Sequence, residues 1–508
     1  LSVRGIEMLV NLRIENFRSF QERQTFSMVS RRISEFSNTL LNKEKIAISK
    51  NILPINIIYG ANASGKTNIF KATELLKKII CDGTISFLAS PTYQFMHTND
   101  DIIKPTHLGM DCVIDNKYFS YDIEFIPNYE KGASKILFEE FKVNSVSLYV
   151  RKDKNVTLCP EKKSVMYYVE TDTDLLKMNQ KQLQGRLDDR KLFLRSTFED
   201  LIANPIVNEF VSWVSESLII QNWFERINLH PIIEGAENEQ ESEFALPNWM
   251  QNFVNIADIG PQRLFYKKTA GNDNEGTWNL LSEYQNSKIR CITSAEQTES
   301  KGTIKLTDLL PLIMITLNAG GTLMIDELDA SIHSSIVANM IQLFLDEDIN
   351  RKQAQLIFNT HNPIYLNRNL VRRDEITFVE KTENFSSELS QLADYCRKDA
   401  DYAKNYMNGQ YGAIKDIDLV RAGDVYSFYL DLSKSIAAIA DKTKSGGYQF
   451  WVVGNRTVKG ELLLSDKIIS EIAEQYGLQH IHTVDRNIIN KVMPSLNSPT
   501  NESGVKSS

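Results

Sequence analysis

The residues with the clearest chemical meaning form a glycine-rich loop behind a short apolar run. Residues 60–67 read Gly-Ala-Asn-Ala-Ser-Gly-Lys-Thr, and residues 55–59 before them read Ile-Asn-Ile-Ile-Tyr. A strand before such a loop and a helix after it let backbone N–H groups surround phosphate oxygens, while the positive end of the helix faces the same anion. Apolar residues at helical spacing predict that helix from Asn68 to about Ile80. The pattern therefore predicts nucleotide binding, with an ordinary glycine turn as the alternative.

Single positions of this loop have separate expected roles. Lys66 is expected to reach the β- and γ-phosphates, and Thr67 is expected to ligate Mg²⁺. The predicted nucleotide-binding residues of the loop are Gly60, Asn62, Ser64, Gly65, Lys66, Thr67 and Asn68.

A pair of acids at the end of an apolar strand forms a second group with chemical meaning. Residues 322–325 read Thr-Leu-Met-Ile, and Asp326 and Glu327 follow directly. Adjacent carboxylates repel each other unless a cation or water lies between them. With Lys66 and Thr67 upstream, we expect Asp326 to hold Mg²⁺ and Glu327 to polarise an attacking water. Without that loop, the same pair would be more typical of a solvated strand end.

The surrounding elements predict an α/β fold with a mixed sheet and an antiparallel edge layer. Helix Thr303–Leu317 precedes the strand that carries the acids, and helix Ile332–Leu345 separates it from a second buried strand at 355–359. Strand, helix and strand at this spacing form a parallel crossover. The alternating residues 9–17 and the strand-rich stretch 109–150 predict the antiparallel layer.

Composition places the chain among ordinary globular proteins. It has 508 residues, 42% of them hydrophobic and 24% charged, which predicts two to four domains. A net charge of −8 argues against a uniformly basic nucleic-acid binder, although a local basic groove stays open. The 5 cysteines form no C-x-x-C pair, so neither a disulfide framework nor a zinc site is predicted.

The sequence shows no sign of a membrane span or a secretory signal. No apolar run approaches the length of about eighteen residues that a spanning helix needs. We expect a cytoplasmic protein without a membrane partner. Residues 1–7 precede Met8, and we expect them to lie upstream of the natural start.

Together these motifs resemble the ABC-type ATPases of the SMC, RecF and OLD group, and most closely the RloA-like AAA-family ATPases of bacterial phage-defence loci. The resemblance covers about residues 8–415. Beyond the phosphate loop and the acid pair, the matching motifs are the opening strand and turn Met8–Phe20, the signature position Glu299–Thr303, the D-loop Leu328–Asp329, the switch-histidine segment from Asn359 through His361, and the closing segment Tyr406–Gly412.

The resemblance implies ATP and Mg²⁺ as ligands, with a homodimer or higher homo-oligomer held together by sandwiched ATP. The signature residues Ser300, Gly302 and Thr303 would serve the ATP bound to the other protomer. His361 would contact the γ-phosphate or the attacking water. The implied catalytic residues are Glu327, His361 and Lys66, and the implied metal ligands are Thr67 and Asp326.

Two further positions stay open. Arg18 would either approach the nucleotide from the opening turn or form a surface ion pair. The glutamine that senses Mg²⁺ in ABC proteins has no clear counterpart, and Gln94 is only a candidate for it.

The predicted domains follow from the same motifs. The two parts of the ATPase head are expected at 8–130 and 291–415, with an inserted strand and helical lobe at 131–290. Within that lobe, residues 174–227 are predicted to be helical, and the acidic stretch 234–243 is predicted to be a loop. The lobe has no long coiled coil, which favours the compact RecF and OLD type. No Toprim nuclease follows residue 415, so an effector nuclease would be a separate chain.

From about Asp424 the sequence changes character. A helix, a Gly-Gly turn and a buried strand are predicted through Arg456, and residues 422–508 resemble the C-terminal part of amino-group DNA methyltransferases from restriction-modification systems. The catalytic Pro-Pro tetrapeptide and the glycine-rich S-adenosylmethionine loop are missing, so we predict no methyl transfer. A solvated face is favoured over DNA contact for the basic residues Arg456, Lys459, Arg486 and Lys491. We expect a truncated or fused reading frame.

Three functions follow. The first is an ATP-hydrolysing, ATP-dimerised switch in anti-phage defence that senses DNA or phage components and controls a separate effector nuclease. The second is a RecF-like DNA repair clamp, and the third is a methyltransferase-associated restriction-modification component.

Overall fold

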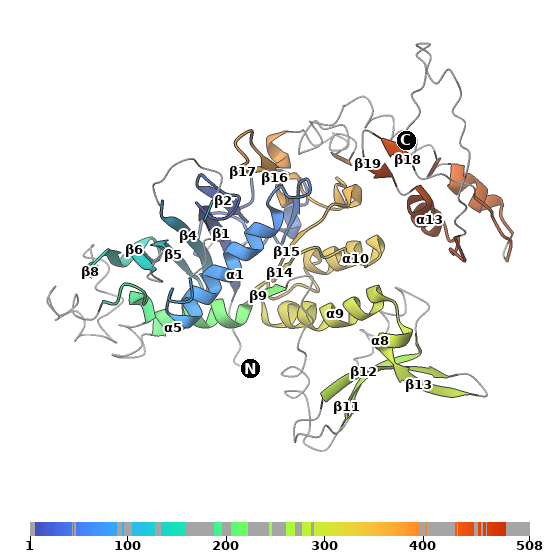
Figure 1. Cartoon of the computed structure of the whole chain (residues 1–508), viewed down its shortest axis with the longest axis horizontal. Coiled ribbons are helices and arrows are strands. Elements are labelled where there is room, and N and C mark those ends of the chain that lie inside the picture. Colours follow the sequence, from blue (N-terminus) through green and yellow to red (C-terminus); the bar gives the residue numbers. More distant parts are fainter. Residues whose placement is uncertain are drawn as a thin grey trace, which may run out of the picture. The chain divides into compact units, whose positions relative to one another are not determined.

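A computed structural model shows a chain that divides into two compact units, Leu1–Asp416 and Ile417–Ser508 (Figure 1). Its α/β class agrees with the prediction, since helices, parallel strands and antiparallel strands all occur in the first unit. The described residues are 6–42, 44, 47–88, 94–95, 104–127, 134–158, 187–195, 205–221, 243–245, 261–269, 277–285, 289–395, 402–403, 432–433, 435–444, 446–451, 456–458, 461–463 and 465–483.

A six-stranded sheet carries the phosphate loop and the acid pair. In sheet order its strands are β17 (Ser387–Gln391), β16 (Ile376–Lys381), β3 (Ile55–Tyr59), β15 (Gln355–Asn359), β14 (Thr322–Ile325) and β9 (Leu218–Gln221). All neighbours pair in parallel except β17, which is antiparallel to β16. With α10 (Ser334–Leu345) between them, β14 and β15 form the predicted parallel crossover. Because parallel strands share one direction, the ends of β3, β14 and β15 meet at one edge of the sheet.

Both faces of this sheet are covered, which explains why its strands are almost continuously apolar. Side chains that alternate along β3 enter different cores: Ile58 packs with α1 (Lys66–Asp82), whereas Ile57 packs with α9 (Lys301–Ala319) and α10. The predicted helices 68–80, 303–317 and 332–345 are therefore confirmed within two residues at each end.

The antiparallel layer is a seven-stranded sheet. Its strands in sheet order are β2 (Gln24–Ser27), β1 (Glu7–Glu15), β4 (Thr106–Ile114), β5 (Lys117–Ile126), β6 (Lys135–Val143), β7 (Val146–Lys152) and β8 (Asn155–Leu158). The side chain of Gln355 ties this layer to the central sheet, because its amide accepts a hydrogen bond from Leu9 N at 2.7 Å and donates one to Leu9 O at 3.1 Å. Strands β6 to β8, which lie in the predicted insert, thus belong to the same sheet as β1.

The rest of the first unit contains shorter elements. A four-stranded antiparallel sheet consists of β10 (Glu243–Ala245), β11 (Arg263–Thr269), β12 (Thr277–Gln285) and β13 (Arg290–Ser294), and the short helix α8 (Ala295–Thr298) follows it. The remaining helical elements are α5 (Pro205–Ser212), the π-helical turn Trp213–Ser217, and the 3₁₀ turns Ser37–Thr39, Pro363–Tyr365, Arg373–Glu375 and Leu392–Asp394.

Within the predicted helical stretch 174–227, α5 and the π-helical turn confirm helix over residues 205–217, whereas the prediction is wrong at the described end that follows them. Residues Leu218–Gln221 form the edge strand β9, which pairs in parallel with β14. The apolar sequence Leu-Ile-Ile suits either structure over so short a stretch, and pairing with a distant strand decides the outcome. Residues 174–186, 196–204 and 222–227 of that prediction lie outside the described residues, as does nearly all of the predicted loop at 234–243.

The second unit has the hairpin β18 (Arg456–Val458) and β19 (Glu461–Leu463) and the helix α13 (Ser465–Gln475). The predicted buried strand after the Gly-Gly turn is wrong for its described part, because residues 447–451 are not a strand and the Phe450 side chain is 93% exposed. We predicted burial of residues 447–451 from their hydrophobicity. Burial also requires a second surface that packs against them. Lys459, Arg486, Lys491 and the segment 406–412 lie outside the described residues. Among the helices that are described, none has the length and apolar character to span a membrane.

Candidate nucleotide-binding site

The phosphate loop joins the end of β3 to the start of α1, as the sequence predicts. Gly65 caps α1 with φ at 114°, a conformation that favours glycine. A Cβ atom built there would lie 2.5 Å from both Ser19 Oγ and Ser387 Oγ. Backbone conformation and close packing therefore both require glycine at this position.

Lys66 lies under this loop with its ammonium turned toward loop carbonyls. Its Nζ donates to Gly60 O at 2.8 Å and to Ala61 O at 2.9 Å. Burial lowers the pKa of Lys66 to about 8, and the negative charges of Glu327 and Asp326 oppose that shift. The two acids after β14 therefore act on the ammonium of the phosphate loop, although 259 residues lie between Lys66 and Asp326 in the sequence.

A direct contact joins the loop to the acid pair. Thr67 Oγ1 donates to Asp326 Oδ1 at 3.1 Å. The Asn359 side chain at the end of β15 bridges the two acids, because its Nδ2 donates to Asp326 Oδ1 while its Oδ1 accepts from Glu327 N at 2.5 Å. Asp326 and Asn359 are both buried. The meeting of three parallel strand ends thus produces one compact polar cluster.

The segment after the acids is held by the strand beside it. Thr360 Oγ1 donates to Asp329 Oδ2 at 2.6 Å, which ties the D-loop residue to the end of β15. His361 lies next to Thr360 at the surface, and partial desolvation together with the positive charge of Lys66 lowers its pKa. The structure therefore brings His361 within electrostatic reach of the phosphate loop.

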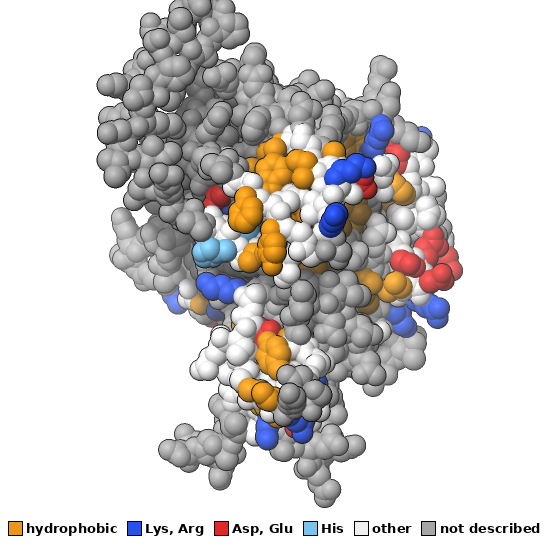
Figure 2. Space-filling model, turned by 90° about the vertical axis from the view of Figure 1, so that its right-hand side faces the viewer, with side chains coloured by type: hydrophobic (Ala, Val, Ile, Leu, Met, Phe, Trp, Pro, Cys, Tyr) orange, Lys and Arg blue, Asp and Glu red, His pale blue; other side chains and the backbone are white. Residues whose placement is uncertain are grey.

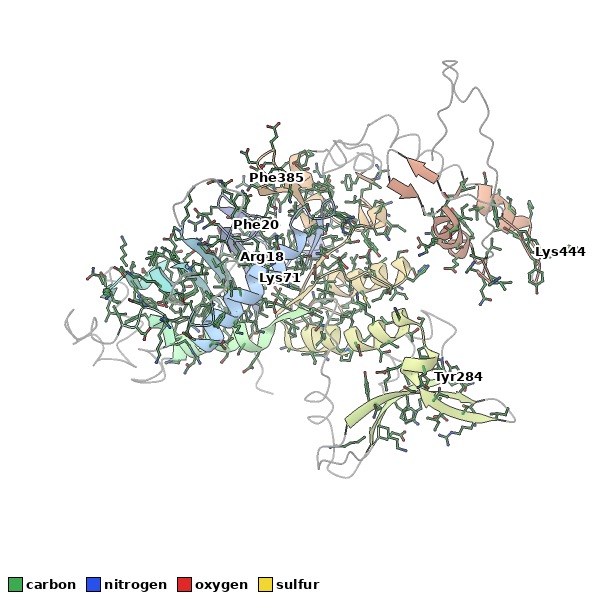
Figure 3. All side chains as sticks on the ribbon, viewed as in Figure 1. Arg18, Phe20, Lys71, Tyr284, Phe385 and Lys444 are labelled. Atoms are coloured by element: carbon green, nitrogen blue, oxygen red, sulfur yellow. The ribbon has the colours of Figure 1, made fainter. Side chains whose placement is uncertain are left out.

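The opening turn contacts the phosphate loop from another side. Figure 3 labels Arg18 and Phe20 of this turn and Lys71 of α1. Ser19 Oγ accepts from Asn68 Nδ2 at 2.8 Å, while Arg18 Nε is buried and has no hydrogen-bond partner. The guanidinium carbon of Arg18 lies 5.8 Å from the centroid of the Phe17 ring, and the approach of Arg18 to a nucleotide stays a prediction.

The start of β17 completes the support of the loop. Ser387 Oγ donates to Ser64 O at 2.5 Å, and Ser387 N donates to Ser19 O at 2.7 Å. Ser387 thus fixes the loop to the opening turn. Sequence reasoning missed this residue, because nothing in a polar hairpin more than 300 residues away marks it as a neighbour of the phosphate loop.

The signature residues lie at the start of α9. Ser300 is the N-cap, and its Oγ accepts from Thr303 N at 3.1 Å. Gly302 packs so closely on Ser331 O that an added Cβ would overlap this backbone oxygen. The signature therefore contacts the segment that follows the acid pair of the same chain.

The positions of two other residues considered for the site, Asn62 and Gln94, say less about its chemistry. Asn62 is exposed on the loop. Gln94 is buried, and its Nε2 donates to Lys104 O at 2.8 Å. The amide nitrogen of Gln94 is therefore bound to a backbone carbonyl.

The donor set fits a magnesium-bound nucleoside triphosphate. The loop offers backbone N–H groups, one ammonium and the buried, unpartnered hydroxyl of Ser64. Thr67 and Asp326 offer two hard oxygens that already face each other. No cluster of three or more His, Cys, Asp or Glu side chains fit to hold a metal occurs in the part of the chain that the structure describes. Mg²⁺ commonly takes one or two carboxylates and completes its shell with phosphate oxygens and water, so the oxygens of Thr67 and Asp326 suit this ion. The arrangement has the parts of the P-loop class of nucleotide-binding sites: a phosphate loop and an acid at the end of a neighbouring parallel strand.

Comparison with known families supports this class over part of the chain. A protein-family model described as "AAA domain, putative AbiEii toxin, Type IV TA system" matches residues 229–367. The match includes the signature, the acid pair and the switch-histidine segment.

Solved structures that match this chain include head domains of SMC proteins. The SMC head domain from Thermotoga maritima is 12% identical, with 76% of this chain and 98% of that chain covered and a TM-score of 0.33. An Smc head domain with an extended coiled coil, bound to the C-terminal domain of ScpA from Pyrococcus furiosus, is 13% identical, with 76% and 96% covered and a TM-score of 0.36.

A different relative matches a short stretch. The Type II methyltransferase M.MvaI of Kocuria varians is 47% identical over 94 residues, which are 18% of this chain and 21% of the methyltransferase. The chain therefore spans about one fifth of the length of this curated relative.

Proposed function

We propose that this protein binds and hydrolyses ATP with Mg²⁺ and acts as an ATP-dimerised switch in anti-phage defence, of the RloA-like and OLD-like kind, with a separate effector nuclease. The hydrogen bond from Thr67 to Asp326 carries this proposal, because it joins the phosphate loop to the acid pair across 258 intervening residues. The family description, which names a toxin of a toxin-antitoxin system, supports a defence role.

The roles of the residues follow from their positions. Backbone N–H groups of residues 60–68, Lys66 and Arg18 would hold the phosphates, and Thr67 with Asp326 would hold the metal ion. A bound Mg²⁺ supplies neutralisation of phosphate charge. Glu327 orients a water and accepts its proton, with His361 beside the same loop. The signature residues Ser300, Gly302 and Thr303 serve the nucleotide of a second protomer.

Phosphate release by the purified chain tests the enzymatic part. Lys66→Ala should abolish binding and turnover, because it removes the ammonium beneath the loop. Glu327→Gln should keep binding but lower kcat by about 10²–10⁴-fold, the usual contribution of a general base. Equal turnover in the wild-type protein and both variants would refute the assignment.

Dimerisation is tested with the same slow variant. Glu327→Gln should become a dimer in light scattering when ATP and Mg²⁺ are added, whereas Lys66→Ala should stay in its ATP-free state. ATP-dependent retention on DNA without any nuclease partner would favour the RecF-like clamp instead.

A second candidate role rests on the methyltransferase relative. The identity over 94 residues favours a link to restriction-modification, and we propose that the matched stretch is the second unit. Large hydrophobic side chains are exposed on that unit, namely Ile439, Tyr448, Phe450, Tyr476 and Ile481. Figure 2 draws one face of the whole chain with its described hydrophobic side chains in orange. Transfer of labelled methyl groups to DNA by the purified chain would establish methyltransferase activity, which we predict to be absent.

A further inference from the structure

Lys305 connects the signature helix to the residue that follows the metal-binding acid. It lies in the second turn of α9, and its Nζ donates to Glu327 O at 2.8 Å and to Ala330 O at 3.2 Å. Sequence reasoning gave Lys305 no role. The contact matters because Glu327 is the proposed general base.

The backbone of Glu327 needs such support. Its φ is 53°, in the left-handed region that residues with a Cβ atom seldom adopt. A conformation of this kind persists only where the surroundings hold it in place. The direction of the Glu327 side chain therefore depends on the contacts made by its two peptide groups.

Both peptide groups are held by hydrogen bonds. The N–H of Glu327 donates to Asn359 Oδ1 at 2.5 Å, and its C=O accepts from Ala330 N at 3.1 Å as well as from Lys305. The contact with Ala330 lies within the same turn and cannot fix that turn relative to the sheet. Asn359 from β15 and Lys305 from α9 thus hold the two peptide groups of Glu327 from outside the turn.

The surroundings of Lys305 are those of an interior ammonium. Its side chain is partly buried, and desolvation lowers its pKa to about 7, while the negative charges of Asp329, Glu327 and Asp326 oppose that shift. Charged lysines commonly remain in water because burial is costly. Gly302 packs against Ser331 one turn earlier on the same helix, so α9 contacts both ends of the segment 327–331.

We propose that Lys305 is a positioning residue for ATP hydrolysis: it holds Glu327 in its working conformation and makes that conformation depend on the place of the signature helix. This inference rests on the proposed function. Because the signature would serve the nucleotide of the other protomer, Lys305 gives the catalytic acid of one site a mechanical link to the occupancy of the second site.

Three variants test the proposal in the full chain. Lys305→Met keeps the length of the side chain and removes its donors, whereas Lys305→Arg keeps donors. Lys154→Met makes the same change at an exposed lysine in the turn between β7 and β8 and serves as the control.

The expected result separates turnover from binding. Lys305→Met should lower kcat about tenfold or more, which corresponds to about 1.4 kcal/mol, while the ATP dissociation constant stays within about threefold because the phosphate loop is untouched. Lys305→Arg should recover most of the turnover, and Lys154→Met should match the wild-type protein. Hydrogen exchange of the amides of residues 327–332 should become faster in Lys305→Met alone.

Other results would overturn the inference. Wild-type kcat in Lys305→Met, or a parallel loss of ATP binding and thermal stability, would show that Lys305 does not position the acid. If the wild-type protein binds no ATP and releases no phosphate, the proposed function fails. Hydrogen exchange then decides the inference alone, since unchanged exchange at residues 327–332 would show that Lys305 does not hold this turn.

Discussion

Replacing Asn359 with aspartate should destabilise the folded chain, and the loss of stability should depend on pH. Asn359 Nδ2 donates to Asp326 Oδ1, and both side chains are buried, with Asn359 0% exposed and Asp326 7% exposed. Asn359→Asp has nearly the same shape but places an oxygen against that carboxylate. The variant therefore isolates the effect of charge from the effect of packing.

The size of the effect follows from these contacts. A hydrogen bond to a charged group contributes about 1.5–3 kcal/mol, and uncompensated buried charge raises the cost of breaking such a contact to about 3–5 kcal/mol. For a unit of this size we expect the melting temperature to fall by about 3–6 °C near pH 8. The loss should be smaller near pH 5, because the folded Asp–Asp pair holds a shared proton more tightly than the unfolded chain does. Stability is thus retained at low pH and lost as the pH rises and that proton leaves.

Thermal melting at about pH 5 and about pH 8, with and without Mg²⁺, measures this behaviour. Added Mg²⁺ should restore part of the loss at the higher pH, since a cation between two carboxylates offsets their repulsion. Asn359→Leu is the control: it removes the same hydrogen bonds without adding charge, so its difference from the wild-type protein should change little with pH or Mg²⁺. If Asn359→Asp showed the same loss at both pH values and no response to Mg²⁺, the two side chains would not be in contact as described.

Three further changes test the packing and charge around the site. Gly302→Ala should lower both the melting temperature and kcat, because the added Cβ would overlap Ser331 O. This overlap outweighs the gain in helix propensity of up to about 1 kcal/mol that alanine brings. A higher melting temperature with normal turnover would contradict the described packing of Gly302. Gly65→Ala should weaken ATP binding in a fluorescent-nucleotide titration, since φ is 114° and Ser387 Oγ leaves no room, and unchanged affinity would mean that the loop has another conformation. Because the pKa of Lys305 is about 7 in the folded chain and 10.5 for a free lysine, the unfolded chain binds more protons between these values. The melting temperature of the wild-type protein relative to Lys305→Met should therefore rise from about pH 7 to about pH 9, and a flat difference would show that Lys305 is not desolvated.

The sequence predicted the parts of the site that local patterns determine. The phosphate loop needs only a strand, two glycines and a helix in order, and the acids need only an apolar strand before them. Their meeting at one sheet edge was predicted from the combination of the two motifs. The pairing of β3 with β15 and the contact between Thr67 and Asp326 agree with it.

Contacts between distant segments could not be predicted in this way. Ser387 reaches the phosphate loop from a hairpin whose polar sequence resembles any surface turn. Residues 218–221 joined the central sheet because β14 offered an open edge, which no local pattern reveals. The role of Lys305 depends on the backbone carbonyls of another segment, and residue types do not show where backbone carbonyls lie.

The segment 326–331 depends both on a local sequence motif and on contacts with distant segments. Its residue types come from a local motif, yet its shape depends on Asn359 and Thr360 from one side and on Lys305 and Gly302 from the other. A left-handed glutamate is disfavoured by itself, so Glu327 keeps its conformation only while β15 and α9 stay packed against it. Any movement of the signature helix must then change either the hydrogen bond of Lys305 or the backbone of Glu327. For this reason we expect hydrolysis, more than binding, to respond to changes at the signature.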